Sequence, residues 1–205
     1  MHPDDWSLAL RELSAADPVM AGLIAAHPGA SLQSRGDAFG TLARSIVGQQ
    51  ISVKAADAVW ARLQARVVDI APARLLAVGL AGLADCGLSQ RKREYLLDLA
   101  GHFVSGRLDP ARWPRLDDAA IIAELTAVRG IGRWTAEMFL IFNLMRPDVY
   151  PLDDIGLQRA VGRHYLGTDK ASRAELIALG QRWQPWRSVA TWYLWRSLDP
   201  LPVEY

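Results

Sequence analysis

Helix start signals recur along the whole chain and leave little room for any other secondary structure. Asp17 precedes Pro18, and an N-cap residue followed by proline at the first helical position predicts a helix over residues 19–27. No segment alternates polar and apolar residues for long enough to form a strand. The same start signals, followed by apolar residues at helical spacing, predict further helices over residues 38–50, 53–67, 90–104, 119–128, 133–145, 155–166, 173–183 and 186–198. The sequence therefore predicts an all-α fold of about nine or ten short helices.

Apolar stripes on two of these segments predict which helix faces are buried, because residues three and four apart share one face of a helix. The stripe in residues 53–67 consists of Val53, Ala56, Trp60, Leu63 and Val67. The stripe in residues 90–104 consists of Leu96, Leu99, Ala100 and Phe103.

Composition and charge exclude several classes of protein. Of the 205 residues, 51% are hydrophobic, and 23 Lys and Arg nearly balance 22 Asp and Glu, which excludes a disordered chain. No apolar run reaches the roughly 18 residues that a membrane span requires. Cys86 is the only cysteine, which excludes an internal disulfide, a cysteine-ligated iron–sulfur cluster and a zinc finger, and predicts a reducing, cytosolic setting. The net charge of +1 gives no indication of a nucleic-acid partner.

The segment Val128–Gly132 (sequence VRGIG) separates two predicted helices and alternates glycine with an aliphatic residue. Glycine permits positive φ and close approach of another backbone, and the aliphatic Ile131 can point back between the helices. The amides of Gly130 and Gly132 then face outward, where a phosphate oxygen fits, and the side chains of Arg133 and Thr135 can add contacts. The alternative is an ordinary corner between two helices that needs glycine only to turn.

Five segments resemble motifs of the helix-hairpin-helix DNA glycosylases, over about residues 39–196. They occur along the chain in the same order as in that superfamily. VRGIGRWTA resembles the DNA-binding hairpin of that superfamily, and the segment that ends in Asp153 and Asp154 resembles the one that carries its catalytic aspartate. The other three matches are residues 45–52 with the minor-groove loop, 87–93 with a Gly-Leu-Ser helix start, and 183–195 with the C-terminal helix. The C-terminal match is to the 3-methyladenine DNA glycosylase II group, and the chain resembles a short form of it that is expected to lack the N-terminal α/β domain.

The resemblance implies two helical lobes with an active-site cleft between them. One lobe is expected to comprise about residues 36–145, including the hairpin at 128–132. The other is expected to form from about residues 1–35 together with 146–205.

The resemblance also implies the catalytic residue and the type of reaction. Asp154 matches the catalytic aspartate, whose carboxylate stabilises the positive charge that develops on the sugar, and Asp153 is expected to cap the helix or order the turn. The alternative is that both aspartates are only helix caps. Trp134 stands where the bifunctional branches carry a nucleophilic lysine, so a monofunctional enzyme without lyase activity is expected.

The remaining site residues also follow from the resemblance. Trp134, Met138 and Trp195 match positions around the base pocket, where aromatic faces attract a cationic alkylated purine. Gln50 matches the residue that fills the gap left by the flipped base, and Gln49 the residue beside it. No cofactor is expected to be required. A structural Na⁺ or K⁺ is expected to bind the hairpin through the backbone of the residues Thr126, Val128 and Ile131.

The function implied is excision of alkylated purines, of the 3-methyladenine and 7-methylguanine type, from duplex DNA, which leaves an abasic site. The alternatives are a glycosylase for another base such as uracil or hypoxanthine, and a non-catalytic helix-hairpin-helix module that binds DNA. A monomer without an obligate protein partner is expected, in the cytoplasm and associated with the nucleoid in a bacterium. The basic run Arg91–Arg93 is expected to be a solvated face, with phosphate contact as its alternative.

Overall fold

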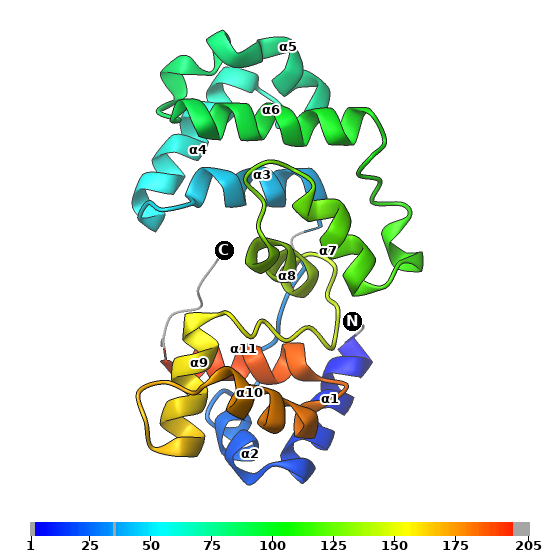
Figure 1. The fold of residues 1–205 in the computed structure, drawn as a ribbon, viewed down its shortest axis with the longest axis vertical. Helices are drawn as coiled ribbons and strands as arrows, with labels where there is room; N and C mark the ends of the chain where they lie inside the picture. The colour runs from blue at the N-terminus through cyan, green and yellow to red at the C-terminus, as the bar shows by residue number, and fades with distance from the viewer. Residues whose placement is uncertain (1–2, 35, 199–205) are drawn as a thin grey trace. The chain divides into compact units, whose positions relative to one another are not determined.

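The computed structural model describes residues 3–34 and 36–198, and within those ranges every regular element is helical (Figure 1). This confirms the all-α prediction. The α-helices are α1 (Pro3–Ala16), α2 (Pro18–Ala25), α3 (Ala38–Gly48), α4 (Val53–Val67), α5 (Pro72–Gly82), α6 (Gln90–Val104), α7 (Asp118–Thr126), α8 (Arg133–Phe142), α9 (Ile155–Val161), α10 (Arg173–Gly180) and α11 (Arg187–Leu198). Short turns of 3₁₀ helix at Ala84–Cys86, Trp113–Arg115 and Gln181–Trp183, and of π helix at Gly162–Leu166, connect them.

Most helices begin at the capping residue that the sequence predicts. The side chains of the N-cap residues accept hydrogen bonds from backbone N–H groups of the first turn, which otherwise have no partner within the helix. This holds for Asp17, Asp37, Ser52, Ser89, Asp117, Asp154 and Ser172. Two helices were not predicted. The start of α1 has the sequence Pro-Asp-Asp, itself typical of a helix N-terminus, and α5 has Ala71 as a cap without a side-chain hydrogen bond.

The predicted stripe on α4 is partly wrong. Val53 lies in the first turn and is 69% exposed, whereas Val59, Leu63 and Val67 are buried. Those three residues are spaced four apart and so lie along one face of the helix, which is the face that packs into the core.

The chain divides into two compact units, each described by itself. The terminal unit comprises residues 1–34 and 140–205, and the central unit comprises residues 35–139. The sequence-based boundaries were near residues 36 and 145. In the terminal unit α11 packs against α1, α2 and α9, and in the central unit α6 packs against α3 and α5 (Figure 1).

A buried carboxylate links distant segments of the terminal unit. Asp17, 2% exposed, accepts N–H groups of Val19 and Met20 through one oxygen. Its other oxygen accepts the Tyr165 hydroxyl and the Trp183 indole N–H, both at 3.0 Å. Because each of these donors would be costly to bury without an acceptor, this one cap residue joins α2 to the segments around residues 165 and 183.

A series of edge-to-face aromatic contacts runs through the core of the central unit. Phe39 contacts Phe103 with ring centroids 5.2 Å apart, Phe103 contacts Trp113 at 6.4 Å, and Trp113 contacts Phe139 at 5.3 Å. Such T-shaped pairs stabilise a core by about 0.5–1.5 kcal/mol beyond the burial of their area.

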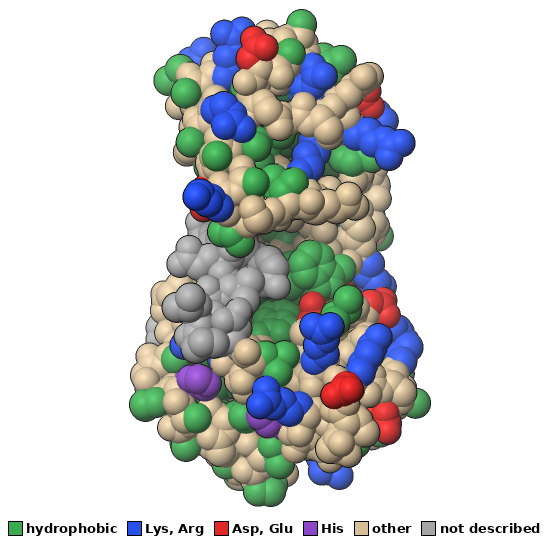
Figure 2. All heavy atoms as spheres, turned by 90° about the vertical axis from the view of Figure 1, so that its left-hand side faces the viewer, with side chains coloured by type: hydrophobic (Ala, Val, Ile, Leu, Met, Phe, Trp, Pro, Cys, Tyr) green, Lys and Arg blue, Asp and Glu red, His purple; other side chains and the backbone are tan. Residues whose placement is uncertain are grey.

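The surface carries charges of both signs. On the face shown in Figure 2, lysine and arginine side chains are interspersed with acidic and uncharged ones in both units, in keeping with the near-zero net charge. Among the residues described, no helix is long and apolar enough to cross a membrane.

Candidate active site

Asp154 is a buried carboxylate at the start of α9. Its backbone is extended, with φ −72° and ψ 122°, so the residue forms the N-cap of the helix. Oδ1 accepts two hydrogen bonds, from the backbone N–H of Leu157 at 2.6 Å and from the indole Nε1 of Trp195 at 2.8 Å. The residue is 7% exposed. Two donors from different parts of the chain therefore fix the orientation of this carboxyl group.

Trp195 belongs to α11 and has a second contact that fixes its ring. It stacks on Phe142, with ring centroids 5.8 Å apart and an interplanar angle of 14°. Gly156 leaves the space for this arrangement, since a Cβ there would lie 3.1 Å from both Asp154 Oδ1 and Trp195 Cδ1. Neither Phe142 nor Gly156 was predicted from the sequence to belong to the site. A glycine in the first turn of a helix lowers helix propensity, and this was the available signal that close packing required it.

Asp153 does not cap the helix, so the capping part of the expectation for it was wrong. Its Oδ1 lies 2.6 Å from Nη1 of Arg173, in an ion pair whose side chains are 68% and 59% exposed. Asp154 is itself the cap, because its side chain reaches the N–H of the third residue of α9. The two adjacent aspartates thus lie in opposite environments, one on the surface and one buried against an indole.

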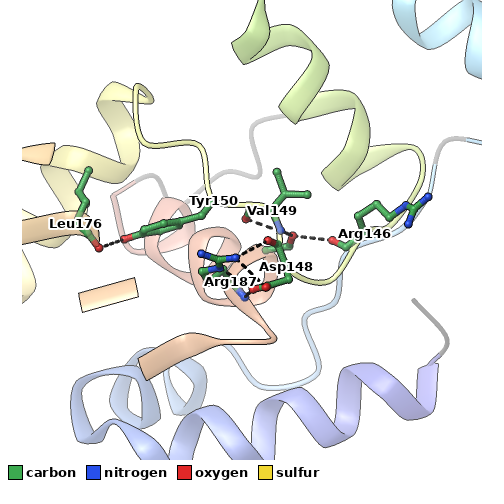
Figure 3. Close-up of polar contacts among 7 residues, drawn as sticks. Arg146, Asp148, Val149, Tyr150, Leu176 and Arg187 are labelled. Carbon is green, nitrogen blue, oxygen red and sulfur yellow. Dashed lines mark hydrogen bonds and ion pairs between the residues drawn. The ribbon is translucent and has the colours of Figure 1, made fainter. Parts of the chain in front are cut away.

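The segment that leads to Asp154 is bound to the start of α11 (Figure 3). The Arg187 guanidinium donates to both carboxylate oxygens of Asp148, at 2.7 and 2.8 Å. Ser188 Oγ donates to the Arg146 carbonyl at 2.6 Å and accepts the Val149 N–H at 2.9 Å. A forked arginine–carboxylate pair is geometrically specific, so α11 fixes this segment at one end and presents Trp195 at the other.

Tyr150 continues the same segment toward α10. Its hydroxyl donates to the Leu176 carbonyl at 3.2 Å (Figure 3), and its ring contacts Trp183 edge-on at 5.8 Å. The Arg187 guanidinium lies 5.9 Å from the ring centroid. Burial raises the pKa of the Tyr150 hydroxyl, which therefore keeps its proton and remains a donor.

The glycine hairpin lies between α7 and α8 and is docked on α6. Gly130 has φ +85°, and a Cβ at this position would overlap the ring of Tyr95. The Arg129 N–H donates to Asp98 at 2.8 Å, and its guanidinium pairs with Glu94 at 3.1 Å. The turn therefore needs glycine for its conformation and for its contact with α6.

The four residues predicted to bind phosphate differ in exposure. Gly132 and Arg133 face solvent, Gly130 is half-buried, and Thr135 is buried at 8%. Arg133 also pairs with Glu137 one turn along α8, at 2.9 Å. The backbone of the turn and Arg133 are thus the groups that a phosphate can reach most readily. Ile131 is buried, as its alternation with glycine predicts.

The two glutamines that follow α3 differ in what they contact. The Gln49 side chain donates to the Gly130 carbonyl at 2.8 Å, so it binds the hairpin. Gln50 is exposed and has φ +59°, a conformation that residues with a Cβ adopt rarely. The central unit thus brings the loop and the hairpin together, a contact that sequence reasoning did not predict.

The residues predicted for the base pocket come from both units. Trp134 and Met138 belong to α8 in the central unit, where they are 37% and 5% exposed. Trp195 belongs to the terminal unit, where its indole N–H donates to Asp154.

The ligands expected for a monovalent cation are backbone carbonyls of the hairpin, those of Thr126, Val128 and Ile131. Thr126 ends α7, and Val128 follows it, in a region where helix carbonyls lack partners within the helix. The Val128 carbonyl accepts the Ile131 N–H at 3.1 Å, and a carbonyl oxygen retains a second lone pair for a ligand. Within the described residues, no group of three or more histidine, cysteine, aspartate or glutamate side chains could hold a metal ion.

These features define an all-helical protein with a glycine hairpin docked on α6 and a buried carboxylate at the start of α9. The chain belongs to the HhH-GPD superfamily of base excision DNA repair proteins, whose sequence profile matches residues 43–185.

Three individual proteins are similar to this chain in sequence or structure. Bacillus subtilis YfjP is 40% identical over 57% of this chain, and the match spans 41% of YfjP, less than half its length. A DNA-3-methyladenine glycosidase structure from Bacillus halodurans is 35% identical with a TM-score of 0.87, covering 96% of this chain and 92% of that one. The Schizosaccharomyces pombe 3-methyladenine DNA glycosylase Mag1, solved in complex with abasic DNA, is 28% identical with a TM-score of 0.80, covering 92% and 95%.

Replacing Gly130 with alanine is expected to destabilise the protein by at least about 2 kcal/mol, because the left-handed backbone and the overlap with Tyr95 are both unfavourable. Urea unfolding measures the change. Gly132→Ala is the matched control, since its Cβ would have no heavy atom within 4 Å, and about 1 kcal/mol or less is expected for it. Equal losses for the two variants would contradict the assigned role of Gly130.

Proposed function

We propose that this chain is a monofunctional DNA glycosylase that excises alkylated purines, of the 3-methyladenine and 7-methylguanine type, from duplex DNA. The observation that carries the proposal is the buried Asp154 carboxylate, oriented by Leu157 and Trp195 in a chain of the HhH-GPD superfamily. The names of the Bacillus halodurans and Schizosaccharomyces pombe relatives support the choice of substrate. Those names give no support to uracil or hypoxanthine as the main substrate, or to a non-catalytic module.

The proposed mechanism begins with the glycosidic bond. Its cleavage develops positive charge on the sugar, as in glycoside hydrolysis, and a fixed carboxylate stabilises that charge. Asp154 supplies the carboxylate and can also orient or deprotonate the attacking water. Because Leu157 and Trp195 already hold it, little reorganisation accompanies the reaction. The products are the free base and an abasic site.

The positive charge of an alkylated purine explains why a fixed carboxylate and aromatic faces are enough for this reaction. Alkylation at N3 or N7 makes a purine cationic, which improves it as a leaving group and attracts it to aromatic faces by about 0.5–2 kcal/mol. The base must first leave the stack. Gln50 is the residue proposed to fill the gap, with Gln49 beside it, and Trp134 is the exposed aromatic residue proposed to contact the base.

Duplex DNA is the proposed partner, bound through its phosphates by the backbone of Gly130 and Gly132 and by Arg133. A Na⁺ or K⁺ ion at the carbonyls of Thr126, Val128 and Ile131 would add positive charge near a phosphate, and no step of the reaction requires it. We propose that the chain acts as a monomer in the compartment that holds the chromosome.

Asp154→Asn is expected to lower base release by at least about a hundredfold while DNA binding is kept, because the amide oxygen can still accept from Leu157 and Trp195. The measurement is chromatography of bases freed from methylated duplex DNA. Asp153→Asn is the matched control, since its ion pair is exposed, and wild-type release is expected. Undiminished release by Asp154→Asn would remove Asp154 from the reaction. No release by the wild type would remove the alkylpurine assignment.

The substitution Trp195→Phe tests the contribution of the indole N–H separately from that of the aromatic ring. Phenylalanine retains a ring that can stack on Phe142 but cannot donate to Asp154. Since a hydrogen bond to a charged group contributes about 1.5–3 kcal/mol, kcat is expected to fall roughly tenfold, with KM little changed. Steady-state base release over a range of substrate concentrations gives kcat and KM. A variant with unchanged kcat and raised KM would assign Trp195 to base contact alone.

The absence of lyase chemistry is tested with borohydride, which traps a Schiff base between protein and abasic DNA. No adduct is expected, because Trp134 lacks the amine that such an intermediate requires. A lysine-bearing lyase of the same superfamily, run in parallel, is the positive control. A trapped adduct with this chain would show that another amine attacks the sugar.

A further inference from the structure

Lys92, in the first turn of α6, contacts the end of another helix. Its Nζ lies 2.7 Å from the Val47 carbonyl and 2.8 Å from the Gln49 carbonyl, where α3 ends. The sequence predicted a solvated basic run at residues 91–93, with phosphate contact as the alternative. For Lys92 the first expectation was wrong, since the residue is half-buried and donates to two backbone carbonyls.

The contact is favourable because the last carbonyls of a helix lack partners within it and carry partial negative charge. A lysine ammonium supplies donors and the opposite charge. Burial lowers the pKa of Lys92 from 10.5, in keeping with an ammonium directed at protein rather than at water. Arg91, its neighbour, is exposed.

The segment that Lys92 contacts leads directly to the exposed Gln50. Gln50 has φ +59°, and a non-glycine residue in that region costs about 1–2 kcal/mol, so neighbouring contacts must hold it there. On the N-terminal side of Gln50, the backbone carbonyl of Gln49 accepts a hydrogen bond from Lys92. The side-chain amide of Gln49 donates to the Gly130 carbonyl of the hairpin.

We propose that Lys92 is a positioning residue which, with the side chain of Gln49, holds the loop 48–52 so that Gln50 is presented to duplex DNA in a fixed relation to the glycine hairpin. The proposal rests on the proposed function, in which Gln50 fills the gap left by the flipped base. Lys92 then contributes to duplex binding through Gln50 and does not touch a phosphate.

The first test is hydrogen exchange of the free protein, which does not depend on activity. Lys92→Met is expected to raise the exchange rate of peptides that cover residues 45–52, while Arg91→Met leaves it at the wild-type rate. Lys92→Arg can donate to both carbonyls and is expected to restore protection. Wild-type exchange in Lys92→Met would overturn the proposal whatever the enzyme's substrate proves to be.

The second test is a double-mutant cycle on binding to a duplex that contains a tetrahydrofuran abasic analogue. Lys92→Met and Gln50→Ala are each expected to weaken binding roughly tenfold, and the double variant to bind no more weakly than either. The slope of log Kd against log salt is expected to stay unchanged in Lys92→Met. Additive losses would show that Lys92 acts independently of Gln50, and a slope reduced by about one would assign Lys92 a direct phosphate contact. Either result would overturn the proposal.

The outcomes separate the failure of this inference from failure of the proposed function. A wild-type protein that releases no methylated purine, together with faster exchange in Lys92→Met, would retain the loop contact and remove the alkylpurine assignment. Release of methylated purines, together with unchanged exchange, would do the reverse.

Discussion

The hydrogen bond from Trp195 to Asp154 is the interaction on which the candidate active site depends. It joins residues 41 positions apart in the chain. The rest of the terminal unit holds its two ends: the pair of Arg187 with Asp148 binds the segment before Asp154 to α11, and α11 carries Trp195 itself. A carboxylate oriented in this way by groups already in place is what stabilisation of a developing positive charge requires.

The central unit fixes the residues proposed to bind DNA by a similar use of contacts between distant segments. The hairpin is docked on α6 through Tyr95, Glu94 and Asp98, and the loop after α3 is bound to the same helix through Lys92. One helix, α6, therefore sets the positions of both elements, although for its residues the sequence offered only phosphate contact by Arg91–Arg93, as an alternative. Rigid support of this kind allows a strained residue such as Gln50 to remain exposed.

Helix starts could be predicted from the sequence because a cap is a local interaction. Ser172 and Glu175, three residues apart, form a capping box, and both residues of that pattern are present in the local sequence. The interruption of α5 by Gly79, at φ +65°, and the exposure of Val53 depend on packing and were not predicted. Lys92 shows the same limit for the site, since its carbonyl partners lie more than 40 residues away and its neighbours Arg91 and Arg93 have the same charge.

The local sequence does not distinguish the roles of Asp153 and Asp154. Both are aspartates in the same turn, and either could cap α9, so composition and spacing do not separate them. Their environments do: a surface ion pair with Arg173 contributes about 1 kcal/mol or less, whereas a buried carboxylate must be matched with donors to be tolerated. Asp154 has the N–H of Leu157 as one donor, and it has the Trp195 indole as a second because Gly156 leaves room for the ring beside it. The residue that distinguishes the two aspartates is therefore a glycine, whose role becomes visible only when α9 and α11 are packed together.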